Sequence, residues 1–226
     1  TEQDRQWIQA DEPGAAVQVL PNGVNLAQFT PVEPLMRSRT IAFTGLMNYP
    51  PNVDAVVWFC DEVLPLIHRT HPDVRFSIIG DKPPLQVREL AVRRGVTVTG
   101  RVTDVRPQIG DCLAVVVPVR SGAGTRLKIL EAMAMKRPVV STALGAEGLD
   151  VVHGKHILLG DTPPALASHI VSLIETPALR DRIASAGREL VQAKYEWGSC
   201  LSRLDDLYHS LVEAGGARRT AHPKVS

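Results

Sequence analysis

A glycine-rich stretch near the middle of the chain holds the residue types best suited to binding chemistry. It runs Pro-Val-Arg-Ser-Gly-Ala-Gly-Thr-Arg-Leu-Lys-Ile-Leu-Glu-Ala-Met-Ala over residues 118–134. Gly122 and Gly124 allow backbone N–H groups to approach a ligand closely. Arg126 and Lys128 place two positive charges where a helix begins, a position that normally favours acidic side chains. This combination predicts a binding site for a polyanion such as a chain of phosphates.

Glu131 adds a second function to the same stretch, because it follows Lys128 by three residues and Arg126 by five. A carboxylate can accept hydrogen bonds from the hydroxyl groups of a ribose. The segment therefore fits a nucleotide whose phosphates meet the cations and whose sugar meets Glu131. The alternative is an ordinary surface loop with solvated charges, because many glycine loops bind nothing.

A dinucleotide-binding site is disfavoured by the spacing. The fingerprint needs G-x-G-x-x-G, but the residue that would be the third glycine is Leu127. The next predicted strand ends in Ser141 and Thr142. Oxidoreductases that bind dinucleotides carry an acidic residue at this place, which binds the ribose.

The elements that must position these residues alternate between short apolar runs and longer helical patterns. Strands are predicted at 40–45, 74–79, 96–99, 113–117 and 138–142. Helices are predicted at 53–68, 85–94, 126–135, 164–175, 178–194 and 197–213, with Asn52 as the N-cap of the first. Such alternation predicts an α/β fold with a doubly wound, Rossmann-like parallel sheet. In such sheets ligands bind beyond the carboxyl ends of the strands, where the glycine-rich loop follows the 113–117 strand.

Composition narrows the class of protein. The chain has 226 residues, 44% of them hydrophobic, and a net charge of +1, so it can build a sizeable core and gives no electrostatic reason to expect nucleic-acid or membrane binding. Its three scattered cysteines, Cys60, Cys112 and Cys200, form no metal-binding pair and fit a reducing compartment. We find no transmembrane segment and no signal peptide, and the first residue is not Met. We expect a trimmed, soluble, cytoplasmic chain.

Several segments, taken together in their order and spacing, resemble one enzyme family. They are Pro21–Asn25, Phe43–Gly45, Ile78–Asp81, Val98–Val102 and Leu130–Val140. From about Val19 to Leu211 the chain resembles the C-terminal domain of retaining family-4 glycosyltransferases of the GT-B fold. The loop at 122–134 is most similar to a subgroup associated with exopolysaccharide and exosortase systems.

The resemblance implies an activity and a site. The enzymes transfer a sugar from a nucleotide diphosphate sugar, UDP- or GDP-linked, with retention and without a metal or other cofactor. Arg126 and Lys128 would act as catalytic cations on the leaving diphosphate. The implied substrate-binding residues are Gly45, Asn48, Arg101, Val102, Gly122, Gly124, Thr125, Leu127 and Glu131.

The sequence departs from the family pattern in two places. The family carries two glutamates eight positions apart; Glu131 matches the second, but the first falls on Ala123. The family also often has Arg and Lys after the first strand's glycine, whereas the loop 46–52 here contains no cation. Arg126 and Lys128 are therefore expected to take over the binding of the diphosphate from those cations.

The resemblance also implies a domain organisation. Residues 1–20 would be the end of a preceding domain and a linker, 21–213 the donor-binding domain, and 214–226 a disordered tail. A saccharide or lipid-linked acceptor would bind through a missing N-terminal domain, which would also carry any peripheral contact with the inner membrane face. The expected role is surface-polysaccharide biosynthesis. Two alternatives remain: a non-transferase nucleotide-sugar enzyme such as an epimerase, and a regulatory nucleotide-binding module.

Other candidate residues have simpler interpretations. His153 and His156 lack a third metal ligand nearby and are predicted to be loop residues. Trp58, Tyr195 and Trp197 are predicted to anchor the core. The roles of two charged residues stay open at this point. Arg101 contacts either the nucleobase or an ion-pair partner, and Glu147 either reaches the donor sugar or is a solvated loop carboxylate.

Overall fold

The computed structural model describes residues 1–32, 39–122, 124 and 126–219. Its centre is a six-stranded sheet in the order β3-β2-β1-β4-β5-β6. All neighbouring strands pair in parallel. The strands are β1 Thr40–Thr44, β2 Arg75–Ile79, β3 Val96–Gly100, β4 Ala114–Val117, β5 Val139–Ser141 and β6 Leu158–Leu159. The predicted α/β fold with an open parallel sheet is confirmed.

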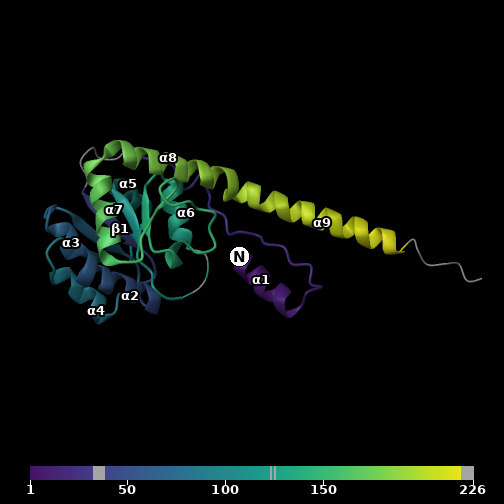
Figure 1. Cartoon of the computed structure of the whole chain (residues 1–226), viewed down its shortest axis with the longest axis horizontal. Helices are drawn as coiled ribbons and strands as arrows, with labels where there is room; N and C mark the ends of the chain where they lie inside the picture. Colours follow the sequence, from purple (N-terminus) through teal and green to yellow (C-terminus); the bar gives the residue numbers. More distant parts are fainter. Residues whose placement is uncertain (33–38, 123, 125, 220–226) are drawn as a thin grey trace, which may run out of the picture.

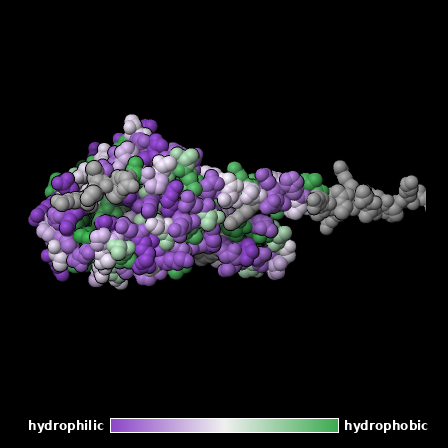
Figure 2. All heavy atoms as spheres, turned by 90° about the horizontal axis from the view of Figure 1, so that it is seen from above, coloured by the Kyte–Doolittle hydropathy of each residue, from purple (hydrophilic) through white to green (hydrophobic). Residues whose placement is uncertain are grey.

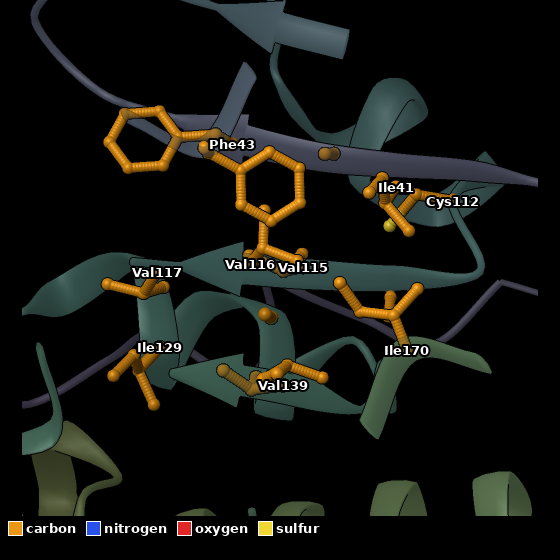
Figure 3. Close-up of a cluster of buried hydrophobic side chains, with 14 of the residues drawn as sticks. Ile41, Phe43, Cys112, Val115, Val116, Val117, Ile129, Val139 and Ile170 are labelled. Carbon is orange, nitrogen blue, oxygen red and sulfur yellow. The ribbon is translucent and has the colours of Figure 1, made fainter. Parts of the chain in front are cut away.

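Apolar strand residues build the core from both faces of the sheet. All four residues of β4 are buried, as expected for a strand covered on both sides. Figure 3 shows Phe43 of β1 beside Val115, Val116 and Val117 of β4, with Val139 of β5 on the other side. The central strands are therefore fixed by packing, and their carboxyl ends have defined positions.

Helices connect and cover the strands (Figure 1). Their bounds are α1 Glu2–Asp11, α2 Pro50–Trp58, α3 Leu64–His68, α4 Leu85–Arg88, α5 Arg106–Asp111, α6 Leu127–Ala134, α7 Pro163–Glu175, α8 Pro177–Lys194 and α9 Trp197–Arg219. A π-helical turn, η1 Phe59–Val63, joins α2 to α3, and two 3-10 turns are η2 Glu89–Val92 and η3 Leu144–Ala146. α3 packs against α7, while α6 packs against α8.

The first long helix differs from its prediction in a way that matters for the site. It begins at Pro50, with Tyr49 as an N-cap that makes no side-chain hydrogen bond. Two prolines in the first turn start the helix, since their fixed φ suits it and they need no partner for an N–H group. The prediction that Asn52 caps this helix is therefore wrong. Further along, η1 precedes Pro65, which cannot donate the regular helical hydrogen bond.

Three elements were missed or shortened in the prediction. The helix α5 and the two-residue strand β6 were not predicted, because both are too short to show a periodic pattern. At the C-terminal end α9 continues to Arg219, so residues 214–219 are helical where a disordered tail was expected. Residues 220–226 of that tail lie outside the described residues.

The N-terminal helix and the long C-terminal helix lie outside the sheet layers. Figure 1 shows α1 to the side of the sheet and α9 projecting away from it. Trp7 of α1 is 68% exposed and Val212 of α9 is 73% exposed. On the face seen in Figure 2, hydrophilic residues cover most of the surface and hydrophobic ones form separate patches. Among the described residues we find no helix with the length and apolar character needed to cross a bilayer.

Candidate functional site

The order of the strands creates a crevice between β1 and β4. The chain moves from β1 to β2 on one side and from β4 to β5 on the other. At such a switch point the loops leaving the two strands turn apart, and open α/β sheets bind ligands there. The two loops meet in this structure, since a Cβ on Gly122 would lie 2.9 Å from Pro51 Cγ and 3.2 Å from Tyr49 Oη.

A cavity of about 540 Å³ opens at this place, a size suited to a small-molecule ligand. We call it the switch-point cavity. It is lined by Thr44, Gly45, Leu46, Tyr49, Asn52, Ile79, Gly80, Asp81, Arg101, Val102, Val105, Arg126, Leu127, Lys128 and Glu131. These residues come from the carboxyl ends of β1, β2 and β3 and from the start of α6, so one cavity combines four segments of the chain.

Two glycines form the floor of the cavity through close backbone packing. A Cβ on Gly80 would collide with the carbonyl oxygen of Gly45, so the ends of β1 and β2 approach more closely than side chains would allow. A Cβ on Gly45 would lie 2.8 Å from Asn52 Nδ2 and 2.9 Å from Lys128 Nζ. The absence of a side chain at Gly45 therefore leaves the space that the amide and the ammonium group occupy.

Lys128 brings a positive charge to the cavity, although its buried surroundings disfavour the charged form. Its Nζ donates to Asn52 Oδ1 at 3.0 Å and lies 3.9 Å from the centroid of the Phe43 ring. Burial lowers the pKa of Lys128 to about 7, with the charge of Arg126 acting in the same direction and that of Glu131 opposing it. An anionic ligand in the cavity would favour the charged form of Lys128.

Arg126 lies one residue earlier relative to the helix than predicted, as the N-cap residue that precedes α6. Its Nη2 donates to the carbonyl oxygen of Gly122 at 2.7 Å. This bond links the start of α6 to the glycine-rich loop, while the side chain still lines the cavity. The N-terminus of α6 has no side-chain cap. The N–H of its third residue, Ile129, donates to the carbonyl oxygen of Arg126 at 2.9 Å, and the N–H groups of the two residues before it lie where a helix offers no regular intrahelical acceptor.

Glu131 lies on α6 one turn beyond Lys128 and also lines the cavity. Burial raises the pKa of its carboxyl group, and the positive charge of Lys128 opposes that shift. A half-buried carboxylate of this kind is a strong acceptor for hydroxyl donors that enter the cavity.

The other predicted site residues are distributed unevenly. Gly45, Arg101, Val102 and Leu127 line the switch-point cavity. Gly122 and Gly124 lie in the neighbouring loop with φ of +88° and +94°, a conformation that favours glycine, but they are not among the lining residues.

Two predicted positions fall elsewhere. Asn48 is not among the residues of the switch-point cavity. It borders a second cavity of about 720 Å³, lined mainly by residues of α2, α4 and η2. Thr125, and Ala123 at the position of the family's first glutamate, lie outside the described residues.

Lining residues that were not predicted come mostly from strand ends. Thr44 ends β1, and Asp81 follows the last residue of β2, Ile79, by two positions. The rule that ligands bind beyond the carboxyl ends of parallel strands could have identified them from the predicted strands. Asn52 had no such signal, because it lies within a helix.

The two histidines that were predicted to be loop residues each accept a hydrogen bond from the backbone. His153 Nδ1 accepts from the backbone N–H of Leu159 at 2.9 Å, and His156 Nδ1 accepts from that of Val152 at 3.2 Å. Across the described ranges no group of three potential metal ligands occurs.

The predicted core aromatics differ from one another. Tyr195 is buried and its hydroxyl accepts from the backbone N–H of Asp150 at 2.8 Å. Trp58 is half-buried against the core. Trp197 packs on Gly23 but stays 41% exposed, so it is not a core residue. Glu147 is exposed and does not line the switch-point cavity.

Comparison with known proteins gives several matches. A family model described as "Glycosyl transferases group 1" matches residues 38–176. A phosphatidyl-myo-inositol mannosyltransferase of Mycobacterium tuberculosis is 27% identical over 235 aligned positions, covering 96% of this chain and 60% of that protein. Anabaena HepE, solved in complex with UDP and glucose, superposes with a TM-score of 0.74 at 18% identity, over 92% of this chain and 61% of that one.

A third match is a single domain. The C-terminal domain of a glycosyl transferase group 1 family protein (LpcC) from Francisella tularensis superposes with a TM-score of 0.61 at 22% identity, covering 77% of this chain and 99% of that one. By contrast, the chain spans only 42% and 60% of the lengths of the first two curated relatives that it matches.

The family match includes the whole site. The matched residues 38–176 are more than half of the 226 residues, and every residue that lines the switch-point cavity lies between Thr44 and Glu131. On the strength of that match, the chain belongs to the glycosyl transferases group 1 family.

Proposed function

We propose that this chain binds the nucleotide-sugar donor of a retaining, metal-independent family-4 glycosyltransferase that acts in surface-polysaccharide assembly. The observation that carries the proposal is the pairing of Lys128 and Glu131 on one helix at one cavity. An ammonium and a carboxylate one helical turn apart suit two neighbouring parts of a nucleoside diphosphate, with the phosphates on the cation and the ribose on the carboxylate.

The chemistry of transfer explains why cations are needed at this place. As the bond from the anomeric carbon to the diphosphate breaks, negative charge grows on the leaving phosphate. Lys128, Arg126 and the backbone N–H groups at the start of α6 are donors held at the cavity before the reaction begins. Donors that meet growing charge stabilise the transition state more than the ground state. The diphosphate is a good leaving group, so we assign no carboxylate pair.

The opposite wall of the cavity suits the nucleobase. Arg101 and Val102 follow the end of β3 directly, and Val105 lies nearby with its side chain partly buried. Apolar valine side chains can cover the base while Arg101 borders the cavity. The Anabaena protein was solved with UDP, which supports a UDP-linked donor. A relative of Corynebacterium glutamicum that is named as a GDP-mannose-dependent mannosyltransferase supports a GDP-linked donor equally.

The comparisons also support the proposed division into domains. The Francisella structure is described as a C-terminal domain and is covered over 99% of its length by this chain. We propose that residues 21–213 form the donor-binding half of the enzyme and that residues 1–20 connect to a second domain. That second domain would bind the saccharide or lipid-linked acceptor and provide any contact with the cytoplasmic face of the inner membrane.

Glu131 provides the sharpest test of this assignment. The Glu131→Gln variant keeps the shape of the side chain but loses its charge, so hydrogen bonds to ribose hydroxyls should weaken. Bonds to a charged group contribute about 1.5–3 kcal/mol, which corresponds to roughly 10- to 100-fold in affinity. We expect UDP or GDP to bind that much more weakly by calorimetry, while the 2′,3′-dideoxy analogue binds the variant and the original protein alike.

The control for this test is Glu147→Gln, since Glu147 is exposed and outside the cavity. It should leave both affinities unchanged. Equal losses of affinity for the ribonucleotide and the dideoxy analogue in Glu131→Gln would show that Glu131 does not bind the ribose hydroxyl groups. If the original protein binds neither UDP, GDP nor their sugar derivatives, the proposed function is wrong.

Gly45→Ala tests the floor of the cavity. The new Cβ would lie within 2.9 Å of both the Asn52 amide and Lys128 Nζ, so both groups must move. We expect nucleoside diphosphate binding to fall by about tenfold or more, the loss of roughly one charged hydrogen bond. Gly14→Ala is the matched control, because nothing lies within 4 Å of a Cβ there. Normal affinity in Gly45→Ala would mean that the ligand does not depend on this arrangement.

A further inference from the structure

Asn52 is a buried polar residue whose two ends both have partners at the cavity. Asn52 lies in the first turn of α2 and is only 8% exposed. Its Nδ2 donates to the carbonyl oxygen of Leu46 at 2.9 Å, and its Oδ1 accepts from Lys128 Nζ at 3.0 Å. One amide therefore joins the loop after β1 to the helix after β4.

The helix itself does not require this amide. Asparagine near a helix start commonly caps the free N–H groups, but α2 starts three residues earlier than first predicted, with Tyr49 in the cap position. Two prolines occupy its first two positions. The polar atoms of Asn52 are thus available for Leu46 and Lys128 rather than for the helix backbone.

The type of partner matters for the charge on Lys128. Within the described part of the chain, no carboxylate lies within ion-pair distance of Lys128 Nζ. The charged groups that influence it, Arg126 and Glu131, lie on its own segment, while Asn52 of α2 and Phe43 of β1 are uncharged. A neutral amide oxygen fixes the direction of the ammonium group without cancelling its charge, so the charge remains for an anionic ligand.

We propose that Asn52 is a positioning residue that orients the Lys128 ammonium group toward the donor diphosphate. Its second hydrogen bond makes this orientation depend on the backbone of the loop after β1. The inference rests on the proposed function. It gives that loop a part in phosphate binding although the loop carries no cation of its own. The chain from Leu46 to Asn52 acts on the phosphate through Lys128, 76 residues away in sequence.

The test compares ligands with and without phosphates. In Asn52→Ala the ammonium group loses its acceptor, so UDP or GDP should bind about tenfold more weakly, the effect of roughly one hydrogen bond to a charged group. Uridine or guanosine should bind as before, because Lys128 does not reach the nucleoside. A purely structural role would weaken nucleoside and nucleotide equally, and that result, or no loss at all, would overturn the proposal.

Two further variants keep the test decisive if Asn52→Ala unfolds. Asn52→Asp keeps the shape but gives Lys128 a negative partner, which should weaken nucleotide binding and keep Lys128 charged to higher pH. In the double variant Asn52→Ala with Lys128→Met, the loss should be no greater than in Lys128→Met alone, since the amide acts through the lysine. Additive losses would overturn the proposal.

The control is Gln192→Ala, an exposed amide on α8 remote from the cavity. It should change neither nucleotide nor nucleoside affinity. A failure of the original protein to bind any nucleotide would instead contradict the proposed function. The proposed function and the role of Asn52 are therefore contradicted by different results.

Discussion

Replacing Lys128 with methionine should weaken the binding of a nucleoside diphosphate by roughly 10- to 100-fold, the range expected for one charge-assisted hydrogen bond. Methionine has a similar length and an apolar end, so it can occupy the space against the Phe43 ring. The same change should leave the thermal midpoint nearly unchanged, because the cost of burying the ammonium group disappears while the buried Asn52 Oδ1 loses its donor. Calorimetry with UDP and GDP and a thermal melt of each variant measure the two quantities.

The combination of the two results distinguishes a binding cation from a structural one. A lysine that mainly stabilised the fold would lose stability and affinity together when replaced. Here we expect lower affinity with nearly unchanged stability, a combination that a lysine needed mainly for the fold would not give. Lys155→Met, which removes an exposed lysine on a loop, is the control for loss of charge alone. Unchanged affinity in Lys128→Met would remove this residue from the diphosphate site.

The fold was predictable because its strongest signals are local. The run of residues 113–117 is apolar throughout, and the strand β4 that it forms is buried at every position. The glycine-rich loop and α6 were found for the same reason, since Arg126, Lys128 and Glu131 lie within six consecutive residues. Hydrophobic periodicity and the position of a loop after a strand carry this information without any knowledge of distant contacts.

The other half of the site depends on contacts that sequence spacing does not reveal. Asn52 meets Lys128 only because β1 and β4 are neighbours in the sheet, although the chain visits β2 and β3 in between. Family resemblance pointed to Asn48, four residues earlier, which borders the second cavity instead. The reason is where the helix begins: residue 48 precedes Pro50, whereas Asn52 lies in the first turn, within reach of α6.

The binding of a nucleotide sugar should also weaken as the pH rises above about 7. Burial lowers the pKa of Lys128 to about 7, and a bound diphosphate must raise that pKa because it stabilises the charged form. Binding therefore takes up a proton between the two pKa values. By linkage the affinity then falls by up to about tenfold for each pH unit in that range. Below pH 7 Lys128 is charged in both states, so this group adds no further dependence there.

A nucleotide sugar is the right ligand for this measurement, because both of its phosphates are diesters that stay ionised throughout the range. Titrations between pH 4 and 9, repeated in buffers of different ionisation enthalpy, give the affinity and the number of protons taken up. Glu131 determines the pH dependence at the acidic end of the range. Burial raises the pKa of its carboxyl group, so protonation at low pH removes an acceptor for the ribose and weakens binding. Lys128→Met should abolish the decline above pH 7 and keep the acidic one. A basic decline that persists in Lys128→Met would assign it to a different group, and a flat profile in the original protein would show that Lys128 stays charged in the empty cavity.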